Sequence, residues 1–313
     1  MKHYLSIKDI DSLPDLVSDA RKLKENPTAY ETLGKGKTIC LLFFNNSLRT
    51  RLSTQKAAMN LGLNVIVMNF GSEGWQLEFA DGAVMNQDKA EHIKEAAKVV
   101  SQYCDILAIR AFASLTDKEK DEAELVLNGF VKYADVPVVN MESSVGHPLQ
   151  ALADAITLDE QKTKAKPKVV LSWAPHPRVL PHAVANSFVK MMQLQDADFV
   201  ITHPKGYELN AEITKDCHIE YNQNKALEGA DFVYVKNWSS YSEYGKNVNQ
   251  DTDWMMTQEK LGVAKFMHCL PVRRNVVVEG AILDSNHTLT TEQANNRTYS
   301  AQIVLKKIVE NLK

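Results

Sequence analysis

Short runs of apolar and β-branched residues recur along this chain of 313 residues and alternate with longer amphipathic stretches. Eight such runs occur, at residues 38–44, 65–69, 105–110, 136–140, 169–173, 199–202, 232–236 and 266–270. Helical patterns lie between them, for example at 90–103 and 180–194. Strands that alternate with helices form parallel sheets, whose ligand sites lie at the carboxyl ends of the strands. The pattern therefore predicts an α/β protein built from doubly wound parallel sheets.

The length predicts about two domains, since ~150 residues is a usual domain size. A predicted helix at 147–161 leads into the charged, proline-containing stretch 162–168, so we place the first domain at 1–146 and the second at 147–289. A last helix is expected from Thr290, with Gln293 as its capping-box partner. Its apolar stripe must dock on another surface, so residues 290–313 are expected to return to the first domain.

Composition excludes several classes of protein. The formal net charge is −3, without the basic excess that is typical of nucleic-acid binders. Four scattered cysteines form no C-x-x-C pair, and His268 and Cys269 lack further ligands at metal-binding spacing, so we expect neither disulfides nor a metal site. The N-terminus does not resemble a signal peptide, and no run approaches the ~20 apolar residues of a membrane span. We therefore expect a cytoplasmic protein with no nucleic-acid or membrane partner.

One motif is suited to phosphate. Residues 43–51 read Phe-Phe-Asn-Asn-Ser-Leu-Arg-Thr-Arg and follow a predicted strand. We expect Asn45 or Asn46 to cap a helix that opens with Ser, Arg and Thr in its first turn. Free backbone N–H groups, the helix dipole, hydroxyls and a guanidinium together favour a phosphate. By itself, an ordinary capped helix with a solvated basic face explains this motif equally well.

Other polar residues stand at strand ends and helix starts. Arg110 ends a predicted strand, and His147 and Gln150 lie three apart in the first turn of a helix, where both can donate hydrogen bonds. Cys269 ends another strand, and Arg297 lies early in the last helix. Taken singly, each has a simpler explanation: a surface arginine, a helix cap, a buried thiol or plain exposure. Their order along the chain is more informative.

Taken together, these motifs resemble the aspartate/ornithine carbamoyltransferase family. The matching motifs follow in the order that the family shows: Ser47-Leu48-Arg49-Thr50-Arg51, Arg110, His147-Pro148-Leu149-Gln150, His268-Cys269-Leu270-Pro271 and Arg297. The resemblance covers nearly the whole chain. It implies a carbamoyl-phosphate domain followed by an amine-substrate domain, no metal or organic cofactor, and a homotrimer with active sites at subunit interfaces.

The resemblance also implies roles for individual residues. Trp75, in the glycine-rich loop 71–76, resembles the residue that is lent to a neighbouring subunit's phosphate site. The implied contacts of carbamoyl phosphate are Ser47, Leu48, Arg49, Thr50, Trp75, Arg110, His147, Pro148, Leu149, Gln150, Cys269, Leu270 and Arg297. Five of these are the implied catalytic residues, namely Arg49, Thr50, Arg110, His147 and Cys269.

The second domain departs from ordinary ornithine enzymes, which carry an Asp that pairs with the free α-ammonium of ornithine. Lys236 stands at that position, and a cation beside an ammonium is repulsive. An acylated α-nitrogen carries no such charge. Together with the proline-rich stretch 174–181, which the resemblance implies is threaded into a knot, this departure resembles the acylornithine branch.

In that branch Glu142 resembles the acceptor of the substrate's amide N–H. Lys236 and His176 resemble contacts of the α-carboxylate and the acyl group, and Arg178 and Arg273 offer further cations for a carboxylate. N-acetylornithine enzymes carry a glutamate after the tryptophan loop, where Ala90 stands here. An alanine leaves room for a succinyl chain, so N-succinylornithine is the expected acceptor.

Two alternatives remain open. If Glu91 rather than Ala90 occupies the acyl-facing position, N-acetylornithine is the expected acceptor. A non-catalytic protein that binds phosphate metabolites on the same fold is the other alternative. The sequence favours the enzyme because every implied phosphate and carbonyl contact is retained. The expected reaction is attack by the neutral δ-amine on the carbonyl carbon of carbamoyl phosphate, with phosphate leaving.

Overall fold

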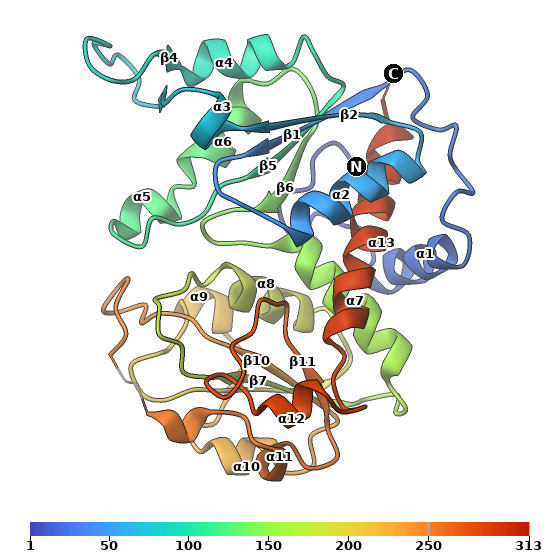
Figure 1. Ribbon diagram of the computed structural model, residues 1–313, viewed down its shortest axis with the longest axis vertical. Helices are drawn as coiled ribbons and strands as arrows, with labels where there is room; N and C mark the ends of the chain where they lie inside the picture. The colour runs from blue at the N-terminus through green and yellow to red at the C-terminus, as the bar shows by residue number, and fades with distance from the viewer. Residues whose placement is uncertain (249–250, 313) are drawn as a thin grey trace. The chain divides into compact units, whose positions relative to one another are not determined.

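We describe the fold from a computed structural model of the chain, for residues 1–248 and 251–312. The chain forms two compact units. Unit 1 comprises Met1–Ser114, Glu119–Leu152 and the chain from Arg297 onward, and unit 2 comprises Leu115–Lys118 and Ala153–Asn296. Both are α/β units with parallel sheets, as the alternation of strands and helices predicts (Figure 1).

Unit 1 is built on a sheet of four parallel strands in the order β2-β1-β5-β6. The strands are β1 (Thr38–Phe43), β2 (Asn64–Asn69), β5 (Ile106–Arg110) and β6 (Val138–Glu142). Alternate side chains of β1 and β5 join an apolar cluster with α4 (Ile93–Val100) and α6 (Leu125–Tyr133). Successive residues of a strand point to opposite faces, so the sheet also buries apolar residues on its other side.

Unit 1 also contains α1 (Leu13–Glu25), α2 (Arg49–Asn60) and the part of α13 (Thr290–Val309) that follows Asn296. Residues of the predicted apolar stripe of α13 are buried. Gln302 of α13 binds the Asn60 side chain at 3.0 Å and the Pro27 carbonyl at 2.6 Å. The last helix therefore docks on the first part of the chain, as its stripe predicts.

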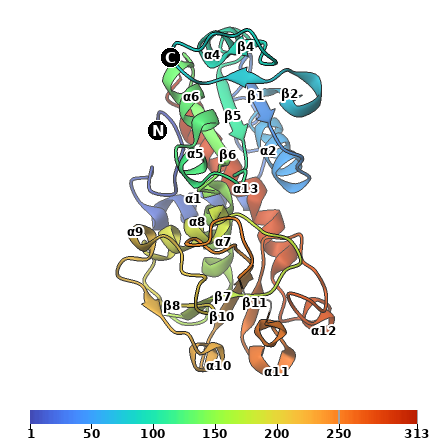
Figure 2. The ribbon, with the colours of Figure 1, turned by 90° about the vertical axis from the view of Figure 1, so that its left-hand side faces the viewer.

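Unit 2 is built on a sheet of five parallel strands in the order β11-β10-β7-β8-β9. Figure 2 labels four of them, β7, β8, β10 and β11. The strands are β7 (Lys168–Trp173), β8 (Asp198–Thr202), β9 (His218–Ile219), β10 (Phe232–Lys236) and β11 (Lys265–Met267). One face packs on α10 (Gln223–Leu227), α11 (Gln258–Leu261) and α12 (Gly280–Leu283). On another face, Phe188 of α8 (Ala183–Met192) lies 4.3 Å from Tyr234 of β10 between ring centroids.

Both sheets have a point at which the strand order reverses. In unit 1 the chain moves outward from β1 to β2 and then returns to β5 on the other side of β1. In unit 2 it moves from β7 to β8 and β9 and then returns to β10 on the other side of β7. Crevices at such switch points bind ligands in open α/β sheets. The loops after β1 and β5, and those after β7 and β10, are therefore the places to look for a site.

Several predicted elements differ in extent. The strand predicted at 136–140 is β6 at Val138–Glu142, and the helix predicted at 180–194 is the shorter α8 at Ala183–Met192. The predicted helix at 90–103 begins only at Ile93, because Glu91–His92 forms β4 and pairs with β3 (Leu77–Glu78). The predicted strand at 266–270 ends at Met267, and His268–Pro271 forms a turn. The remaining elements are α3 (Phe70–Glu73), α5 (Lys118–Glu122), α7 (Pro148–Gln161), α9 (Ala211–Thr214) and the short helix η1 (Thr252–Trp254). Within the described residues, no helix is both long and apolar enough to cross a membrane.

Candidate active site

The predicted phosphate motif lies at the switch point of unit 1. Leu48 precedes the first turn of α2, and the predicted capping by Asn45 or Asn46 is wrong, since no side chain caps this helix. Asn45 Oδ1 instead accepts the N–H of Phe112 at 2.6 Å, so it ties the loop after β1 to the loop after β5. The first N–H groups of α2 are therefore not taken by a cap, which suits an anion.

Arg110, at the end of β5, is buried rather than on the surface. Its Nη1 donates to the carbonyls of Asn45 and Asn46 at 3.1 and 2.6 Å, and its Nε donates to Glu142 Oε2 at 3.1 Å. Burial lowers the pKa of Arg110, while Glu142 opposes that shift. The guanidinium thus holds the loop after β1 against the end of β6.

A chain of polar contacts runs from Glu142 to α2. Glu142 Oε2 lies 3.5 Å from His147 Nε2, and His147 Nε2 lies 3.3 Å from Arg297 Nη2. Arg297 Nη2 also donates to the hydroxyl of Thr50. A guanidinium only donates, so Nε2 of a neutral His147 accepts and Nδ1 carries the proton. Together with Arg110, these four residues therefore form one buried polar cluster in unit 1.

Arg49 differs from these residues. Its Nε atom is buried and has no hydrogen-bond partner within the described chain. A buried donor without an acceptor costs free energy, so such an atom indicates an acceptor that is bound from outside. The other predicted contacts in unit 1 differ in burial: Ser47 is half-buried, Leu48 is exposed, and Pro148, Leu149 and Gln150 are buried at the start of α7.

Trp75 and Ala90 lie on the segment that carries β3 and β4. The Trp75 side chain is 56% exposed, and its Nε1 donates to Glu91 Oε2 at 2.9 Å. The backbone N–H of Ala90 donates to the carbonyl of Gln76 at 3.2 Å, and Ala90 is exposed. The Glu91 carboxylate is thus held by Trp75 of its own chain, whereas the small Ala90 side chain is open to solvent.

Basic residues gather at the switch point of unit 2. His176, in the proline-rich loop after β7, receives Nε–H of Arg273 on its Nε2 at 3.2 Å. Its Nδ1 lies 2.9 Å from the carbonyl oxygen of Arg178 and 3.1 Å from the backbone nitrogen of Arg178, so the ring is tied to both Arg178 and Arg273. Burial lowers the pKa of His176, and the positive charges of Lys236, Arg273 and Arg178 lower it further.

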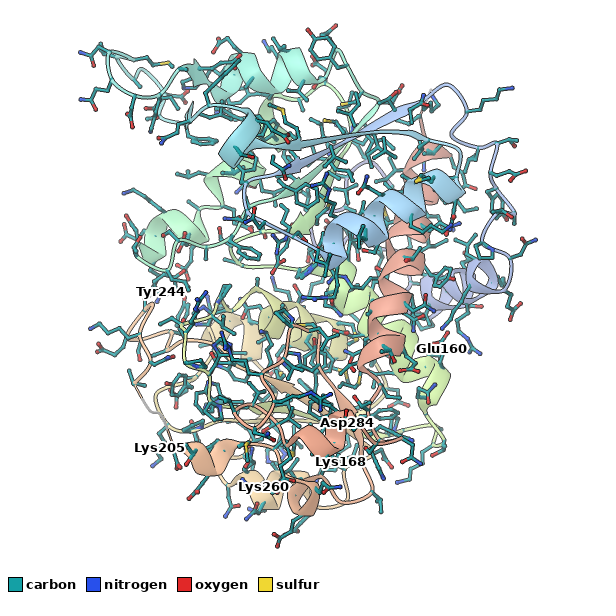
Figure 3. All side chains as sticks on the ribbon, in the orientation of Figure 1. Glu160, Lys168, Lys205, Tyr244, Lys260 and Asp284 are labelled. Carbon is teal, nitrogen blue, oxygen red and sulfur yellow. The ribbon has the colours of Figure 1, made fainter. Side chains whose placement is uncertain are left out.

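None of the three cations around His176 pairs with a carboxylate of the described residues. The neighbouring Arg274 shows the contrast, because it forms an ion pair at 2.6 Å with Asp284, a residue that Figure 3 labels. Like charges held together without a counter-charge favour an anionic ligand. Of the residues predicted for the acyl substrate, four therefore meet in unit 2, while Glu142 and Ala90 belong to unit 1.

The proline-rich loop is bonded to the segment that follows β10. Asn237 Nδ2 donates to the Ala174 carbonyl at 2.7 Å, and Ser239 N–H donates to the Leu180 carbonyl at 3.0 Å. These bonds hold His176 and Lys236 near each other. Whether the chain is threaded into a knot at residues 174–181 stays a prediction.

The sequence indicates neither Tyr234 nor Asp154 for the site, and it indicates Gln293 only as a helix cap. All three are buried in unit 2, where Gln293 donates to Asp154 Oδ1 at 2.9 Å and accepts the N–H of His268 at 2.8 Å. One signal could have found Asp154: it follows His147 and Gln150 at helical spacing, on a helix whose intervening residues are apolar. Tyr234 stands in an otherwise apolar strand, which by itself indicates only a buried ring.

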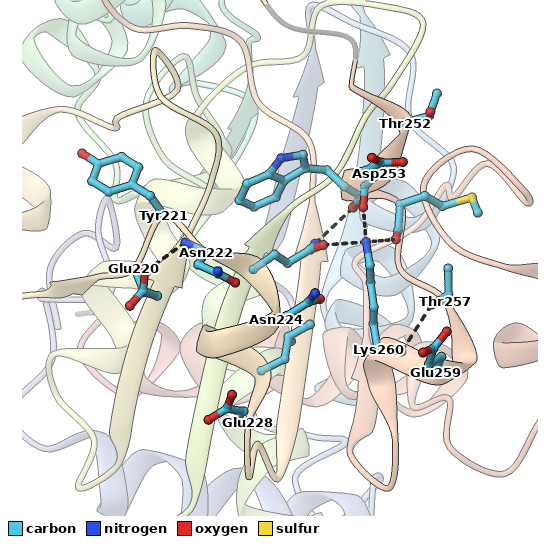
Figure 4. Close-up of a pocket in the computed structure, with 14 residues that line it drawn as sticks. Glu220, Tyr221, Asn222, Asn224, Glu228, Thr252, Asp253, Thr257, Glu259 and Lys260 are labelled. Atoms are coloured by element: carbon cyan, nitrogen blue, oxygen red, sulfur yellow. Dashed lines mark hydrogen bonds between the residues drawn. The ribbon is translucent and has the colours of Figure 1, made fainter.

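A cavity of about 1180 Å³ in unit 2 contains none of the predicted site residues. It lies between α10 and α11 (Figure 4). The Lys260 side chain lines it, and its Nζ donates to Gln223 Oε1 at 2.8 Å and to the carbonyls of Asp253 and Met255. All these partners are parts of the chain itself. The lysine therefore fastens the segment around η1 to α10.

Comparison with known proteins identifies the class of protein. Residues 2–160 match the family model of the aspartate/ornithine carbamoyltransferase carbamoyl-P binding domain, and residues 181–308 match the Asp/Orn binding domain of the same family. The chain belongs to the aspartate/ornithine carbamoyltransferase family and is a carbamoyltransferase, as its motifs predict.

Two relatives within this family illustrate the similarity of the whole chain. The chain is 46% identical to N-succinylornithine carbamoyltransferase of Bacteroides thetaiotaomicron over the full length of both proteins. It is 34% identical to N-acetylornithine carbamoyltransferase of Xanthomonas campestris, over 99% of this chain and 98% of the relative.

Solved structures agree with these relatives. Acetylornithine transcarbamylase complexed with acetylcitrulline matches with a TM-score of 0.93 at 33% identity, over 98% of this chain and 99% of that one. A variant of N-acetyl-L-ornithine transcarbamylase, in which valine replaces a glutamate, matches with a TM-score of 0.92 at 33% identity, over 98% of this chain and all of that one. That variant is complexed with carbamyl phosphate and N-succinyl-L-norvaline.

Proposed function

We propose that this protein transfers the carbamoyl group of carbamoyl phosphate to the δ-amine of N-succinyl-L-ornithine. The products are N-succinyl-L-citrulline and phosphate, and the reaction belongs to arginine biosynthesis in the cytoplasm. The observation that carries the choice of acceptor is the group of Lys236, Arg178 and Arg273 around His176, for which the described part of the chain supplies no carboxylate partner. Free ornithine would bring its α-ammonium as a fourth positive charge to this place, whereas N-succinylornithine brings two carboxylates.

The unit 1 cluster supports the carbamoyl-phosphate half of the proposal. The N-terminus of α2, Ser47 and the buried Nε of Arg49 offer donors to the phosphate, with Arg297 beside Thr50. Leu48, Pro148, Leu149 and Gln150 enclose the carbamoyl group. The first unit with the last helix is accordingly the carbamoyl-phosphate domain, and the second binds the acylornithine.

In the proposed reaction the neutral δ-amine attacks the carbonyl carbon, and a C–N bond forms as the C–O bond to phosphate breaks. Thr50, Arg110 and His147 stabilise the oxyanion that develops on the carbonyl oxygen. Arg49 and Arg297 stabilise the departing phosphate, which takes the proton that the amine loses. Cys269 and the carbonyl of Leu270 orient the amine, and holding two reactants in register supplies the proximity term.

Ala90 is the proposed determinant of the acyl group. A glutamate in its place would repel the succinyl carboxylate and occupy its room. Glu91 is the other candidate for this position, but its carboxylate is bound to Trp75. We also include in the proposal a homotrimer in which Trp75 reaches a neighbouring phosphate site, and Glu142 as acceptor of the amide N–H. The exposure of both Trp75 and Ala90 is compatible with a position at a subunit interface.

The test measures ureido product from carbamoyl phosphate with ornithine, N-acetylornithine or N-succinylornithine. We expect turnover of the succinyl compound, and we expect Ala90→Glu to shift preference toward the acetyl compound by at least ~10-fold, the scale of one charge placed against another. Glu91→Ala is the matched control and should leave the preference unchanged. Wild-type preference for N-acetylornithine, together with a shift in Glu91→Ala, would assign the position to Glu91 and the acetyl substrate to this enzyme.

A further inference from the structure

Two of the three nitrogens of the Arg110 guanidinium are bound to the chain itself. Nε donates to Glu142 Oε2 at 3.1 Å, and Nη1 donates to the carbonyls of Asn45 and Asn46 at 3.1 and 2.6 Å. The donors of a guanidinium all lie in its plane. Among the described residues, the third nitrogen, Nη2, makes no hydrogen bond. It is therefore the nitrogen of Arg110 that is available to a ligand.

The aromatic ring of Phe112 covers one face of this guanidinium. The central carbon of the guanidinium, Cζ, lies 4.0 Å from the centroid of the ring. That distance is well within the ~6 Å at which a cation and a ring face attract each other. Arg110 is buried and Phe112 is half-buried, so little water competes for this contact. The hydrogen bonds fix the guanidinium within its plane, and the ring resists tilting of that plane.

Asn45 connects the two kinds of contact. Its backbone carbonyl accepts from Arg110 Nη1, and its side-chain Oδ1 accepts the backbone N–H of Phe112 at 2.6 Å. Phe44, the residue before it, donates its backbone N–H to the Arg110 carbonyl at 2.9 Å. The backbone that carries the Phe112 ring is thus tied to the loop after β1, and the side chain of Asn45 is the tie.

We propose that Phe112 and Asn45 are positioning residues for Arg110. The Phe112 ring sets the tilt of the guanidinium plane, and Asn45 holds the ring in place. Nη2 then donates to the carbonyl oxygen of carbamoyl phosphate as negative charge develops on that oxygen. A donor that is already oriented needs no reorganisation when the charge appears, which is why it accelerates the reaction. This inference rests on the proposed role of Arg110 in stabilising the oxyanion.

Fluorination of the Phe112 ring tests the proposal while largely keeping the shape of the ring. Fluorine withdraws electron density from the ring face, so mono-, di- and trifluorinated phenylalanine at this position weaken the attraction of a cation in steps. We expect kcat to fall with each step. Phe112→Leu, which has no ring, should lower kcat by about 10-fold, the scale of a desolvated cation–π contact. KM for carbamoyl phosphate should change little, because an interaction made in the transition state acts on kcat.

A kcat that fluorination leaves unchanged, with a loss only in Phe112→Leu, would overturn the inference, since the ring would then serve for packing alone. The same fluorinated series at Phe199 is the matched control. Phe199 is also half-buried, stands at the start of β8 and has no cation over its ring among the described residues. Its kcat should stay constant through the series.

Asn45→Ala tests the tie between the two loops. This substitution removes the side chain and keeps the backbone carbonyl that Arg110 binds. Because both residues act on one guanidinium, the variant that combines Asn45→Ala with Phe112→Leu should be little slower than the slower single variant. Losses that multiply fully would remove Asn45 from the inference.

Every variant is assayed with whichever amine the wild-type enzyme carbamoylates. The role of Arg110 is the same for any acceptor amine, so the two proposals fail separately. Failure of N-succinylornithine as acceptor would count against the proposed function, and a constant kcat in the fluorinated series would count against the positioning role.

Discussion

Arg49 is the arginine of unit 1 whose guanidinium depends most on a ligand. Arg110 and Arg297 donate to carbonyls, a carboxylate, a hydroxyl and an imidazole of the chain itself. Their positions are set by the folded protein. The buried Nε of Arg49 has no such acceptor among the described residues. A leaving phosphate would supply one, so Arg49 is the residue through which charge on that phosphate is most directly stabilised.

Arg49→Ala should therefore lower kcat by at least ~100-fold, as removal of a single donor at a developing charge does in other enzymes. Steady-state kinetics with saturating carbamoyl phosphate measures the loss. Arg21→Ala, at an exposed arginine of α1, is the control and should keep normal kinetics. Near-normal kcat in Arg49→Ala would remove this residue from the proposed mechanism.

At the scale of single residues, the sequence predicts which side chains matter better than it predicts what they touch. Arg110, His147 and Arg297 belong to short motifs that can be read directly. That Glu142 lies between Arg110 and His147 depends on how the ends of β5 and β6 pack, which no local pattern encodes. Asn45 illustrates the same limit: its type suits a helix cap, but a backbone N–H from the next loop takes its oxygen instead.

At the scale of elements, α2 is defined more sharply at its end than at its start. Gly62 follows the helix with a φ of +76°, and a Cβ there would lie 2.0 Å from the Glu31 carbonyl oxygen. Gly36 has a similar φ of +79°, but a Cβ there meets nothing within 4 Å. The two glycines thus separate the cost of a left-handed backbone from the cost of a collision.

Gly36→Ala should lower the free energy of unfolding by about 1–2 kcal/mol, the cost of a left-handed backbone conformation in a residue with a Cβ. Gly62→Ala should lower it by more than about 3 kcal/mol, because the backbone of residue 31 must also move. Urea unfolding of both variants measures the difference. Equal losses would mean that the chain around Glu31 yields easily.

Elements with long, regular patterns are predicted well, and short ones are not. The strands β1, β7 and β10 lie within one residue of their predicted limits, and α13 begins at Thr290 as predicted. The predicted role of Gln293 as its capping-box partner is wrong, because this side chain binds the N–H of His268 and the carboxyl group of Asp154 instead. β3, β4 and β9 have two residues each, which is too short for any periodicity to appear. The predicted helix at 90–103 is shortened because pairing with β3 takes Glu91 and His92, a tertiary effect.

At the scale of the whole molecule, burial lowers the pKa of several histidines in the same direction. Burial lowers the pKa of His3, His176 and His203 below the ordinary value of 6.5. These histidines resist protonation in the folded state, and the unfolded chain binds more protons than the folded one as pH falls. The free energy that these neutral histidines contribute to stability is fully present above the pKa of histidine in the unfolded chain. It is lost as the pH falls from that value through the lower pKa of the folded state.

The midpoint of urea unfolding should therefore decrease as the pH is lowered from about 7.5 to about 5.5, the range in which histidine titrates. His203→Asn should make this dependence shallower, because His203 is buried and its ring bonds only the Pro204 carbonyl among the contacts described. A midpoint that stays constant or rises toward low pH would contradict the expected sign.

The order of segments in unit 1 has a consequence for how the protein is made. Arg297 and the buried residues of α13 complete a unit that otherwise comes from the first half of the chain. On the ribosome, all of unit 2 is translated before they appear. Until they are translated, the first half of the chain therefore has an unfilled core and an incomplete anion site, whereas unit 2 already has all the strands of its sheet. Translation speed and chaperone access over this interval would then decide how much of the newly made chain reaches the active fold.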